Sequence, residues 1–314
     1  MPLQTIFPSN AEGVAQAAAR IRAGELVAFP TETVYGLGAN ALDDAAVRRI
    51  FEAKGRPATS PLIVHAASLE MAREFVAAWP PGAEMLARRF WPGPLTLVLE
   101  KRDTIPDRVT AGLPTVGIRV PSHPVALALI KAAGVPIAAP SANPFTGLSP
   151  TTAQHVARGL GISFILDGGP SLVGIESTVV SLVAGVAALL RPGMISRVDI
   201  EALIGPLQVA PDPASGPHSA PGQHRTHYSP STPLLLVSSG NLPAGRGAYL
   251  YYTTAAPAAR ALRIGSTPAA YAAQLYALLH QLDQEKFDWI AVEAPPPGDE
   301  WAAIADRLGR AARP

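Results

Sequence analysis

Apolar residues along the first 205 positions recur with two different periods. Short apolar runs at residues 25–29 and 62–65 end at turn residues, which is typical of buried strands. Residues 11–22 and 43–54 instead place apolar residues three and four positions apart, as on one face of a helix, and a glycine follows each stretch. Helices and strands therefore alternate, and this alternation predicts an α/β sheet domain.

The same pattern continues through the rest of this region. Further strands are predicted at residues 94–99, 116–120, 137–139, 164–166 and 178–182, and further helices near 68–77, 82–90, 122–133 and 151–159. The apolar runs at 178–183 and 186–190 are separated only by Ala184 and Gly185, a spacing typical of a hairpin. An antiparallel hairpin within an alternating α/β pattern predicts a mixed rather than a wholly parallel sheet.

From residue 206 to residue 233 the chain changes character. Seven prolines and small polar residues replace the apolar periodicity, as in an extended linker. Beyond it, strands at 234–237, 248–252 and 289–292 and helices at 268–282 and 299–309 predict a small Rossmann-like α/β domain. The predicted organisation is a larger domain at residues 1–205, a linker at 206–233 and a smaller domain at 234–314.

Composition and charge narrow the possible functions. The formal net charge is +1 and no run of Lys or Arg occurs, which argues against a dedicated nucleic-acid binder. The absence of cysteine excludes disulfides, thiolate nucleophiles and cysteine-ligated metal sites. The N-terminus does not resemble a signal peptide, and no segment has 18 consecutive apolar residues. We therefore expect a cytoplasmic protein without membrane spans.

Polar residues gather where predicted elements end. Lys54 and Arg56 flank the glycine that ends a helix, so both side chains can reach phosphate or carboxylate oxygens. Alternatively, Lys54 complements the helix dipole and Arg56 is solvated. Ser141 and Asn143 follow a buried strand, where ligand-binding residues collect in α/β sheets, although an ordinary turn would also explain them. Ser149 suits either a helix cap or an anion contact.

Three further candidates lie on or beside predicted strands. Arg119 falls on the polar face of its strand, either in a cleft or in a structural ion pair. Ser177 and Arg191 sit at strand edges, where they could complete the cleft or simply form turns. His224 and His227 lie three apart in the predicted linker without further ligands, and we expect them to be solvated.

Common catalytic motifs are missing from the chain. There is no Gly-x-x-x-x-Gly-Lys-Ser/Thr loop, no Gly-x-Ser-x-Gly elbow and no His-Glu-x-x-His pair, and the run from Gly36 to Gly38 is too short for a phosphate loop. The polar candidates as a set nevertheless predict a cleft that binds an anionic substrate.

Six ordered blocks carry a resemblance to a known family. They are FPTETVYGLG at residues 29–38, KGR at 54–56, PLIVH at 61–65, WPGPLT at 91–96, APSAN at 139–143 and GIEST at 174–178. In this combination the chain resembles the YrdC-like threonylcarbamoyl-AMP synthase family. The proline-rich linker, with HYSP at 227–230, and the additional small domain resemble its two-domain long form. The resemblance implies a twisted mixed sheet with a large polar cleft.

The resemblance also implies an activity and a set of roles. The family forms L-threonylcarbamoyladenylate and pyrophosphate from L-threonine, bicarbonate and ATP, for N6-threonylcarbamoyladenosine at position 37 of tRNA. By motif position, the residues around threonine and its carbamate would be Thr33, His65, Arg119, Ala139 and Ser177. The ATP-binding residues would be Arg56, Ser60, Thr115, Ser141, Ser149, Arg191 and Tyr228. Lys54 and Asn143 would face the phosphates and, with Arg56 and Ser141, serve catalysis.

Further expectations follow from the resemblance. Mg²⁺ would accompany ATP, held mainly by substrate oxygens and water because few protein carboxylates are in view. The product would pass transiently to a tRNA threonylcarbamoyl transferase. The chain departs from the family pattern at Ser60, where many relatives have Asn, and in its C-terminal domain of about 80 residues, which is short. The alternative from another class is a module that binds double-stranded RNA or tRNA without catalysis, which would need a contiguous basic patch.

Overall fold

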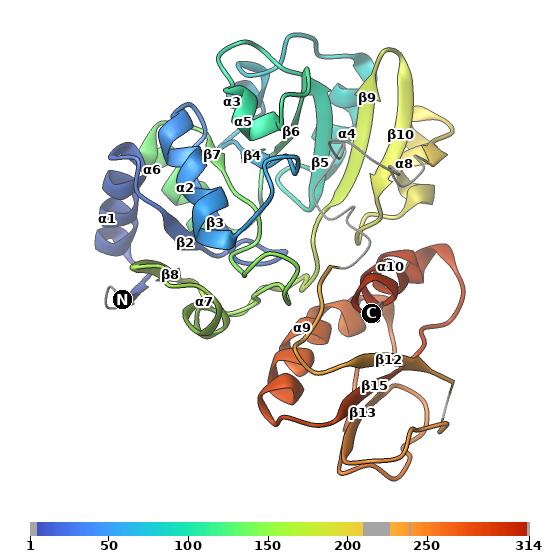
Figure 1. The fold of residues 1–314 in the computed structure, drawn as a ribbon. Coiled ribbons are helices and arrows are strands. Elements are labelled where there is room, and N and C mark those ends of the chain that lie inside the picture. Colours follow the sequence, from blue (N-terminus) through green and yellow to red (C-terminus); the bar gives the residue numbers. More distant parts are fainter. Residues whose placement is uncertain (1–4, 210–226, 239, 313–314) are drawn as a thin grey trace.

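The computed structural model describes residues 5–209, 227–238 and 240–312. Two sheets organise these residues, a large one in the N-terminal part and a small one in the C-terminal part (Figure 1). Helices cover both sheets, and the sheet positions are filled mainly by buried aliphatic side chains. The chain is thus an α/β protein with a larger and a smaller unit, as the sequence predicts.

The large sheet has eleven strands in the order β1-β8-β2-β3-β7-β4-β6-β5-β9-β10-β11. The strands are β1 (Thr5–Pro8), β2 (Val27–Phe29), β3 (Gly36–Asn40), β4 (Ile63–His65), β5 (Leu95–Glu100), β6 (Thr115–Arg119), β7 (Ile137–Ala138), β8 (Phe164–Asp167), β9 (Thr178–Val183), β10 (Val186–Arg191) and β11 (Gln208–Val209). Parallel pairs such as β4–β6 and β5–β9 alternate with antiparallel pairs such as β5–β6 and β9–β10. The predicted mixed sheet and its hairpin are confirmed.

The helices of the larger unit are α1 (Ala11–Arg22), α2 (Asp44–Lys54), α3 (Leu69–Arg73), α4 (Pro81–Phe90), α5 (Asp107–Thr110), α6 (Pro124–Ala133), α7 (Ala153–Gly159) and α8 (Arg197–Ile204). Helix α2 illustrates how the local sequence determines where a helix begins and ends. The Asp43 carboxylate accepts hydrogen bonds from the amides of Ala45 and Ala46, and Gly55 ends the helix at a φ of 63°. The end of α2 places Lys54 close to the loop after β7 and Arg56 close to the residues before β4.

The smaller unit contains a four-stranded sheet in the order β12-β15-β13-β14, with all three strand pairs parallel. Its elements are β12 (Leu234–Val237), β13 (Gly247–Tyr251), β14 (Arg260–Arg263), α9 (Pro268–Gln284), β15 (Trp289–Glu293), the 3₁₀ turn η1 (Asp299–Trp301) and α10 (Ala302–Ala311). Helices α9 and α10 lie between this small sheet and the larger unit (Figure 1). A wholly parallel sheet with covering helices matches the predicted Rossmann-like architecture.

The two units share an apolar cluster. Ile175 and Leu148 of the larger unit pack in one buried cluster with Tyr271 and Leu275 of α9. Gly174 approaches α9 so closely that a Cβ atom there would lie 2.3 Å from the carbonyl oxygen of Ala272, and its φ is +81°. Any larger residue at this position would separate the backbone from α9. The block at residues 174–178 is therefore anchored against the C-terminal unit.

Several elements differ from the sequence prediction. The sequence did not predict strands β1, β3, β11 and β14 or helices α5 and α8. Strand β3 was missed because it contains two glycines, Gly36 and Gly38, whose backbone packs tightly against Phe29 and, at Gly38, Ile137. The helix predicted at 68–77 ends at Arg73. Strand β11 pairs with β10, so the large sheet extends beyond residue 205, the predicted end of the first domain. Most of the predicted linker, residues 210–226, lies outside the described residues.

Candidate active site

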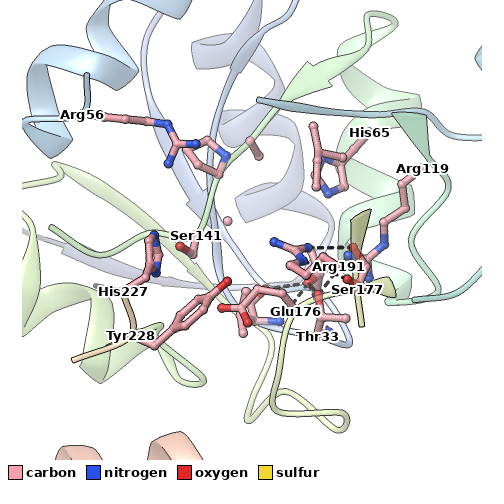
Figure 2. A pocket seen from close by; sticks show the side chains of 16 residues that line it. Thr33, Arg56, His65, Arg119, Ser141, Glu176, Ser177, Arg191, His227 and Tyr228 are labelled. Atoms are coloured by element: carbon pink, nitrogen blue, oxygen red, sulfur yellow. Dashed lines mark hydrogen bonds between the residues drawn. The ribbon is translucent and has the colours of Figure 1, made fainter. Parts of the chain in front are cut away.

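A polar cavity lies where loops and strand ends of the large sheet meet the segment that leads into the smaller unit (Figure 2). It is lined by the following predicted site residues: Thr33, Arg56, His65, Arg119, Ala139, Ser141, Ser177, Arg191 and Tyr228. Three guanidinium groups and a single carboxylate, that of Glu176, belong to its lining. This balance of charge favours an anionic ligand.

Arg119 forms one end of the cavity at the C-terminal end of β6. Its Nη2 lies 2.7 Å from a carboxylate oxygen of Glu32, and both side chains are at most 6% exposed. Its Nη1 donates to Oγ1 of Thr33 at 3.0 Å, and its Nε donates to the carbonyl of Gly93 at 3.1 Å. Burial by itself would raise the pKa of Glu32, but Arg119 more than offsets this and the pKa is lowered. Both alternatives for Arg119 hold, because it is ion-paired and lines the cavity.

His65 lies beside Arg119 on the neighbouring strand, since β4 and β6 pair with these two residues in register. Burial, followed by the positive charge of Arg119, lowers the pKa of His65 to about 3, so its imidazole is neutral at physiological pH. Its Nδ1 is buried and has no hydrogen-bond partner among the residues that the structure describes. A neutral imidazole with an unpaired nitrogen can exchange a hydrogen bond with a polar ligand.

Ser177, immediately before β9, and Arg191, the last residue of β10, lie together. The Arg191 Nε donates to the carbonyl of Ser177 at 3.1 Å, and its Nη2 donates to the Ser177 hydroxyl at 3.2 Å. That hydroxyl also lies 2.8 Å from Oγ1 of Thr96. Burial lowers the pKa of Arg191 from its ordinary value, and the group remains charged at neutral pH. The hairpin predicted from the apolar pattern thus brings a cation to the cavity.

Arg56 approaches the cavity from the other side, near Ser141 and Tyr228 (Figure 2). Its Nε donates to the carbonyl of Ser60 at 3.2 Å and its Nη2 to the carbonyl of Pro61 at 3.0 Å. Burial lowers its pKa to about 10, which leaves the guanidinium charged at neutral pH. The interpretation of Arg56 as a solvated surface residue is therefore wrong.

Lys54 does not belong to the cavity lining. Its ammonium is buried and donates to the carbonyl of Ser141 at 2.7 Å and to the carbonyl of Asn143. Burial, and then the charge of Arg56, holds the pKa of Lys54 well below its usual range. The Asn143 amide in turn donates to the carbonyls of Pro144 and Gly147 at 2.9 and 2.8 Å. These contacts fix the loop that carries Ser141 into the cavity.

Asn143 also lies outside the lining, and so do three further predicted residues, Ser60, Thr115 and Ser149. Ser60 is buried beside Arg56, and Thr115 is half-buried at the start of β6. Because Ile63 of β4 pairs with Gly117 of β6, Thr115 lies at the Ser60 end of this strand pair. Ser149 is completely buried and donates to a carboxylate oxygen of Glu176 at 2.5 Å. Ser60 contacts Arg56 and Ser149 contacts Glu176, so these two residues support side chains that line the cavity.

His227 and Tyr228 close the cavity from the segment before β12. Tyr228 is 1% exposed, has a φ of 63°, and its hydroxyl has no hydrogen-bond partner among the described residues. His227 is also buried and packs its ring 4.1 Å from that of Tyr228 and 6.0 Å from that of Phe145. The expectation of a solvated His227 is wrong, because aromatic packing holds it at the cavity. His224 lies outside the described residues.

Two carboxylates of the site were not singled out from the sequence. Glu32 pairs with Arg119 behind the cavity, and Glu176 lines the cavity beside Ser177. Both lie within the sequence blocks at residues 29–38 and 174–178, each of which contains a single acidic residue. A carboxylate among buried residues requires a cationic or hydrogen-bonding partner, and this requirement is the sequence signal that could have identified both glutamates.

The geometry defines the kind of chemistry that this cavity supports. Guanidinium groups, hydroxyls and a neutral imidazole can bind and orient anionic substrates, whereas none of the lining residues is a cysteine or lysine nucleophile. Among the described residues no cluster of three or more His, Asp or Glu side chains could hold a metal ion. The two site carboxylates already contact arginines. Catalysis by positioning and charge neutralisation suits this arrangement.

Comparison with known proteins agrees with this fold and site. A family model described as "Telomere recombination" matches residues 19–193, and a model described as "Threonylcarbamoyl-AMP synthase, C-terminal domain" matches residues 195–313. The threonylcarbamoyl-AMP synthase of Bacillus subtilis is 44% identical over 97% of this chain and 94% of the relative. That of Schizosaccharomyces pombe is 36% identical over 91% of this chain and 84% of the relative.

Solved structures extend the comparison. The crystal structure of Sua5 from Pyrococcus abyssi complexed with L-threonine superposes with a TM-score of 0.91 at 40% identity, covering 99% of this chain and 97% of that one. The structure of YciO from E. coli has a TM-score of 0.54 at 24% identity and covers 61% of this chain and 96% of that one, a likeness of fold alone.

Fold and site together define an α/β enzyme with an arginine-lined cavity at the large mixed sheet, closed by His227 and Tyr228 of the segment before the small parallel sheet. The two family models cover residues 19–193 and 195–313, and full-length relatives align over nearly the whole chain. The chain belongs to the threonylcarbamoyl-AMP synthase family. The resemblance recognised in the six sequence blocks is confirmed. Among the described residues, no helix has the length and apolar character needed to cross a membrane.

Proposed function

We propose that this enzyme forms threonylcarbamoyl-AMP and pyrophosphate from L-threonine, bicarbonate and ATP. The observation that carries the proposal is the placement of Arg56, Arg119 and Arg191 around one cavity that also contains a neutral His65. The three substrates together bring a carboxylate, a carbonate group and a triphosphate. Three buried cations in one cavity are suited to these anions.

At the Arg119 end we propose the threonine subsite. The guanidinium of Arg119 would bind the amino-acid carboxylate, and the hydroxyls of Thr33 and Ser177 and the imidazole of His65 would contact its polar groups. Thr33 and Ser177 each already hydrogen-bond an arginine of the cavity. Ala139 has no bulky side chain and would leave space for the threonine methyl group. The ion pair with Glu32 keeps Arg119 in place before the substrate arrives.

At the Arg56 end we propose the nucleotide subsite. Arg56, Arg191 and Ser141 would contact ATP directly. Ser60 lies beside Arg56 and Ser149 bonds to Glu176, and Thr115 would reach the nucleotide from the start of β6. The free volume of the cavity is about 50 Å³, whereas ligand pockets usually have about 300–1,000 Å³. We therefore propose that the lining opens to admit ATP, which would contact Tyr228 at this end of the cavity. The unpaired Tyr228 hydroxyl would then close onto the nucleotide.

The reaction needs no protein nucleophile. The threonine amine attacks the carbon of bicarbonate or CO₂, and the carbamate forms with loss of water or a proton. A carbamate oxygen then attacks the α-phosphorus of ATP, the bond to the bridging oxygen breaks, and pyrophosphate leaves with that electron pair. The arginines hold the reacting groups together and offset the developing negative charge.

Magnesium belongs to the substrate in this proposal. The carboxylates Glu32 and Glu176 are ion-paired with Arg119 and Arg307, so the described lining does not fit a resident Mg²⁺ site. We therefore expect Mg²⁺ to enter on the phosphate oxygens of ATP. We further propose that the product passes to a tRNA threonylcarbamoyl transferase, since a mixed anhydride of this kind hydrolyses readily.

The test is a substrate-omission experiment with the purified enzyme. Pyrophosphate release with Mg-ATP, threonine and bicarbonate should require threonine and bicarbonate, and mass spectrometry should detect an adenylate that contains threonine. Arg119→Met should release little threonine-dependent pyrophosphate, whereas Arg88→Ala, in an exposed surface pair, should behave as the wild type. Pyrophosphate release that is indifferent to threonine in the wild type would show the proposal to be wrong.

A further inference from the structure

Arg307 is an unusual residue of the C-terminal unit, because its whole side chain is buried at 1% exposure. It projects from α10 into the larger unit, where its Nε donates to a carboxylate oxygen of Glu176 at 2.9 Å. Its Nη2 donates to the Glu176 carbonyl at 3.3 Å, and its Nη1 donates to the Pro192 carbonyl at 3.0 Å and to the Asp306 carboxylate at 2.7 Å. All its donor nitrogens are thus directed to partners.

Glu176 is the point where this arginine meets the active site. The carboxylate lines the cavity and accepts hydrogen bonds from Ser149 at 2.5 Å, from Tyr276 of α9 at 3.2 Å and from Arg307. Burial would raise the pKa of Glu176, but Arg307 and then Arg191 lower it, so the carboxylate is ionised at neutral pH. Two of its three side-chain partners come from the C-terminal unit.

Arg307 also contacts the residue that closes the cavity. Its Cζ lies 5.2 Å from the centroid of the Tyr228 ring, within the range of a cation–π interaction. The same ring lies 6.0 Å from that of Tyr276. The guanidinium of Arg307 therefore contacts both the Glu176 carboxylate and the Tyr228 ring, two groups that line the cavity.

We propose that Arg307 is a positioning residue of the active site, through which the C-terminal unit holds Glu176 and Tyr228 in the geometry that the nucleotide subsite needs. The inference rests on the proposed function, because it assigns that end of the cavity to ATP. Arg307 acts through the two residues and not on the substrate. Ser149 is oriented in the same way, since its hydroxyl donates to the carboxylate that Arg307 fixes.

The competing explanation is that Arg307 only joins the two units. A joining residue would affect the stability of the enzyme and the affinity for both substrates alike. A positioning residue would affect the ATP end and leave the threonine end, built on Arg119 and His65 of the larger unit, unchanged. The two explanations differ in which substrate loses affinity.

The first experiment compares Arg307→Ala with Arg260→Ala, an arginine of the same unit that is 46% exposed and forms a 3.9 Å ion pair with Glu285. We expect Arg307→Ala to lower kcat/KM for ATP by about 10- to 100-fold, the range that loss of a supporting partner costs at other sites. The Kd for threonine, from isothermal titration, should stay within about twofold of wild type. Arg260→Ala should match the wild type in both. Equal losses for ATP and threonine, or no loss, would overturn the proposal.

The second readout is the pH profile of kcat/KM for ATP. Without Arg307, burial dominates and the pKa of Glu176 rises, so Arg307→Ala should lose activity on acidification at a higher pH than the wild type. The charged or titratable groups that face Glu176 are Arg191, Tyr228, Tyr276 and Arg307, with Asp306 behind Arg307. Adding Glu176→Gln to Arg307→Ala should abolish this shift. A shift that persists in the double variant would assign it to another group and contradict the mechanism.

A third variant covers the case in which Arg307→Ala does not fold because a buried carboxylate has lost its partner. Arg307→Met with Glu176→Gln replaces both charges by neutral groups of similar size. We expect a Tm close to wild type, an unchanged Kd for threonine, and a KM for ATP that stays raised because Tyr228 has lost its guanidinium. A wild-type KM for ATP in this folded variant would overturn the proposal. If the wild type itself released no threonine-dependent pyrophosphate, the proposed function would fail instead.

Discussion

Variants of the buried ion pair between Arg119 and Glu32 can distinguish an effect on the stability of the fold from an effect on threonine binding. Arg119→Met leaves Glu32 without its counter-ion and removes the hydrogen bonds to Thr33 and the Gly93 carbonyl. Loss of one partner of a buried ion pair costs about 3–5 kcal/mol, because an uncompensated charge remains away from water. For a domain of this size about 1 kcal/mol corresponds to about 2–4 °C, so the Tm should fall by about 6–20 °C.

The assay pairs thermal unfolding with titration of threonine. Glu32→Gln combined with Arg119→Met should recover most of the lost Tm, because neither buried charge remains, yet it should not bind threonine. Arg108→Met is the matched control, since its pair with Asp44 is exposed and is worth about 0–1 kcal/mol. Threonine binding at wild-type affinity in the double variant would refute Arg119 as the carboxylate partner.

The pH dependence gives an independent check of the same reasoning. In the wild type the pKa of Glu32 is lowered, so the pair stabilises the fold fully above the unfolded pKa of about 4.3, and this contribution is lost as pH falls through the folded value. In Arg119→Met burial, the largest influence on Glu32, is no longer offset by Arg119, so the pKa of Glu32 rises and the cost of its buried charge is relieved on acidification. The Tm difference between the two proteins should therefore be smaller at about pH 5 than at about pH 7.5. A difference that does not change with pH would refute the argument.

Three further predictions concern single side chains of the site. Lys54→Met removes the hydrogen bonds to the carbonyls of Ser141 and Asn143, so Tm and ATP turnover should fall together; unchanged turnover at a lowered Tm would contradict this. Tyr228→Phe deletes a hydroxyl without a described protein partner, so Tm should hold or rise while the KM for ATP increases. Burial and Arg119 lower the pKa of His65 to about 3, so His65→Gln should reduce the rate without changing the shape of the pH–rate profile between about pH 6 and pH 8.

The fold was predictable where the apolar pattern was strong and local. The limits of α1 and α2 follow from the caps Asn10 and Asp43 and from the positions of nearby glycines, all of which are visible in the sequence. Strand β3 was not predictable, because Gly36 and Gly38 lower strand propensity and serve instead the close approach of neighbouring side chains. Tertiary packing overrides local propensity at that strand.

In the site, too, the sequence predicted which residues gather there but not the contacts that they make with residues distant in the chain. The blocks at residues 54–56 and 139–143 pointed to Arg56 and Ser141, which line the cavity. They could not show that Lys54 turns away from it, since the direction of a lysine ammonium depends on which carbonyls are within reach. The solvated reading of His227 failed for a related reason, because the polar surroundings in sequence hide the rings of Tyr228 and Phe145 in space.

The contact between Arg307 and Glu176 is the extreme case, because 131 residues separate the two partners. Neither residue is informative alone, since an arginine on an amphipathic helix is ordinarily solvated and a glutamate in a loop ordinarily caps or solvates the backbone. The sequence does indicate that the Glu176 carboxylate requires a partner. Glu176 stands in a block whose neighbours Ile175 and Ser177 are buried, so its carboxylate needs a cation from some other element. That cation comes from the C-terminal unit, so the ionised carboxylate of the cavity depends on a side chain of the smaller unit.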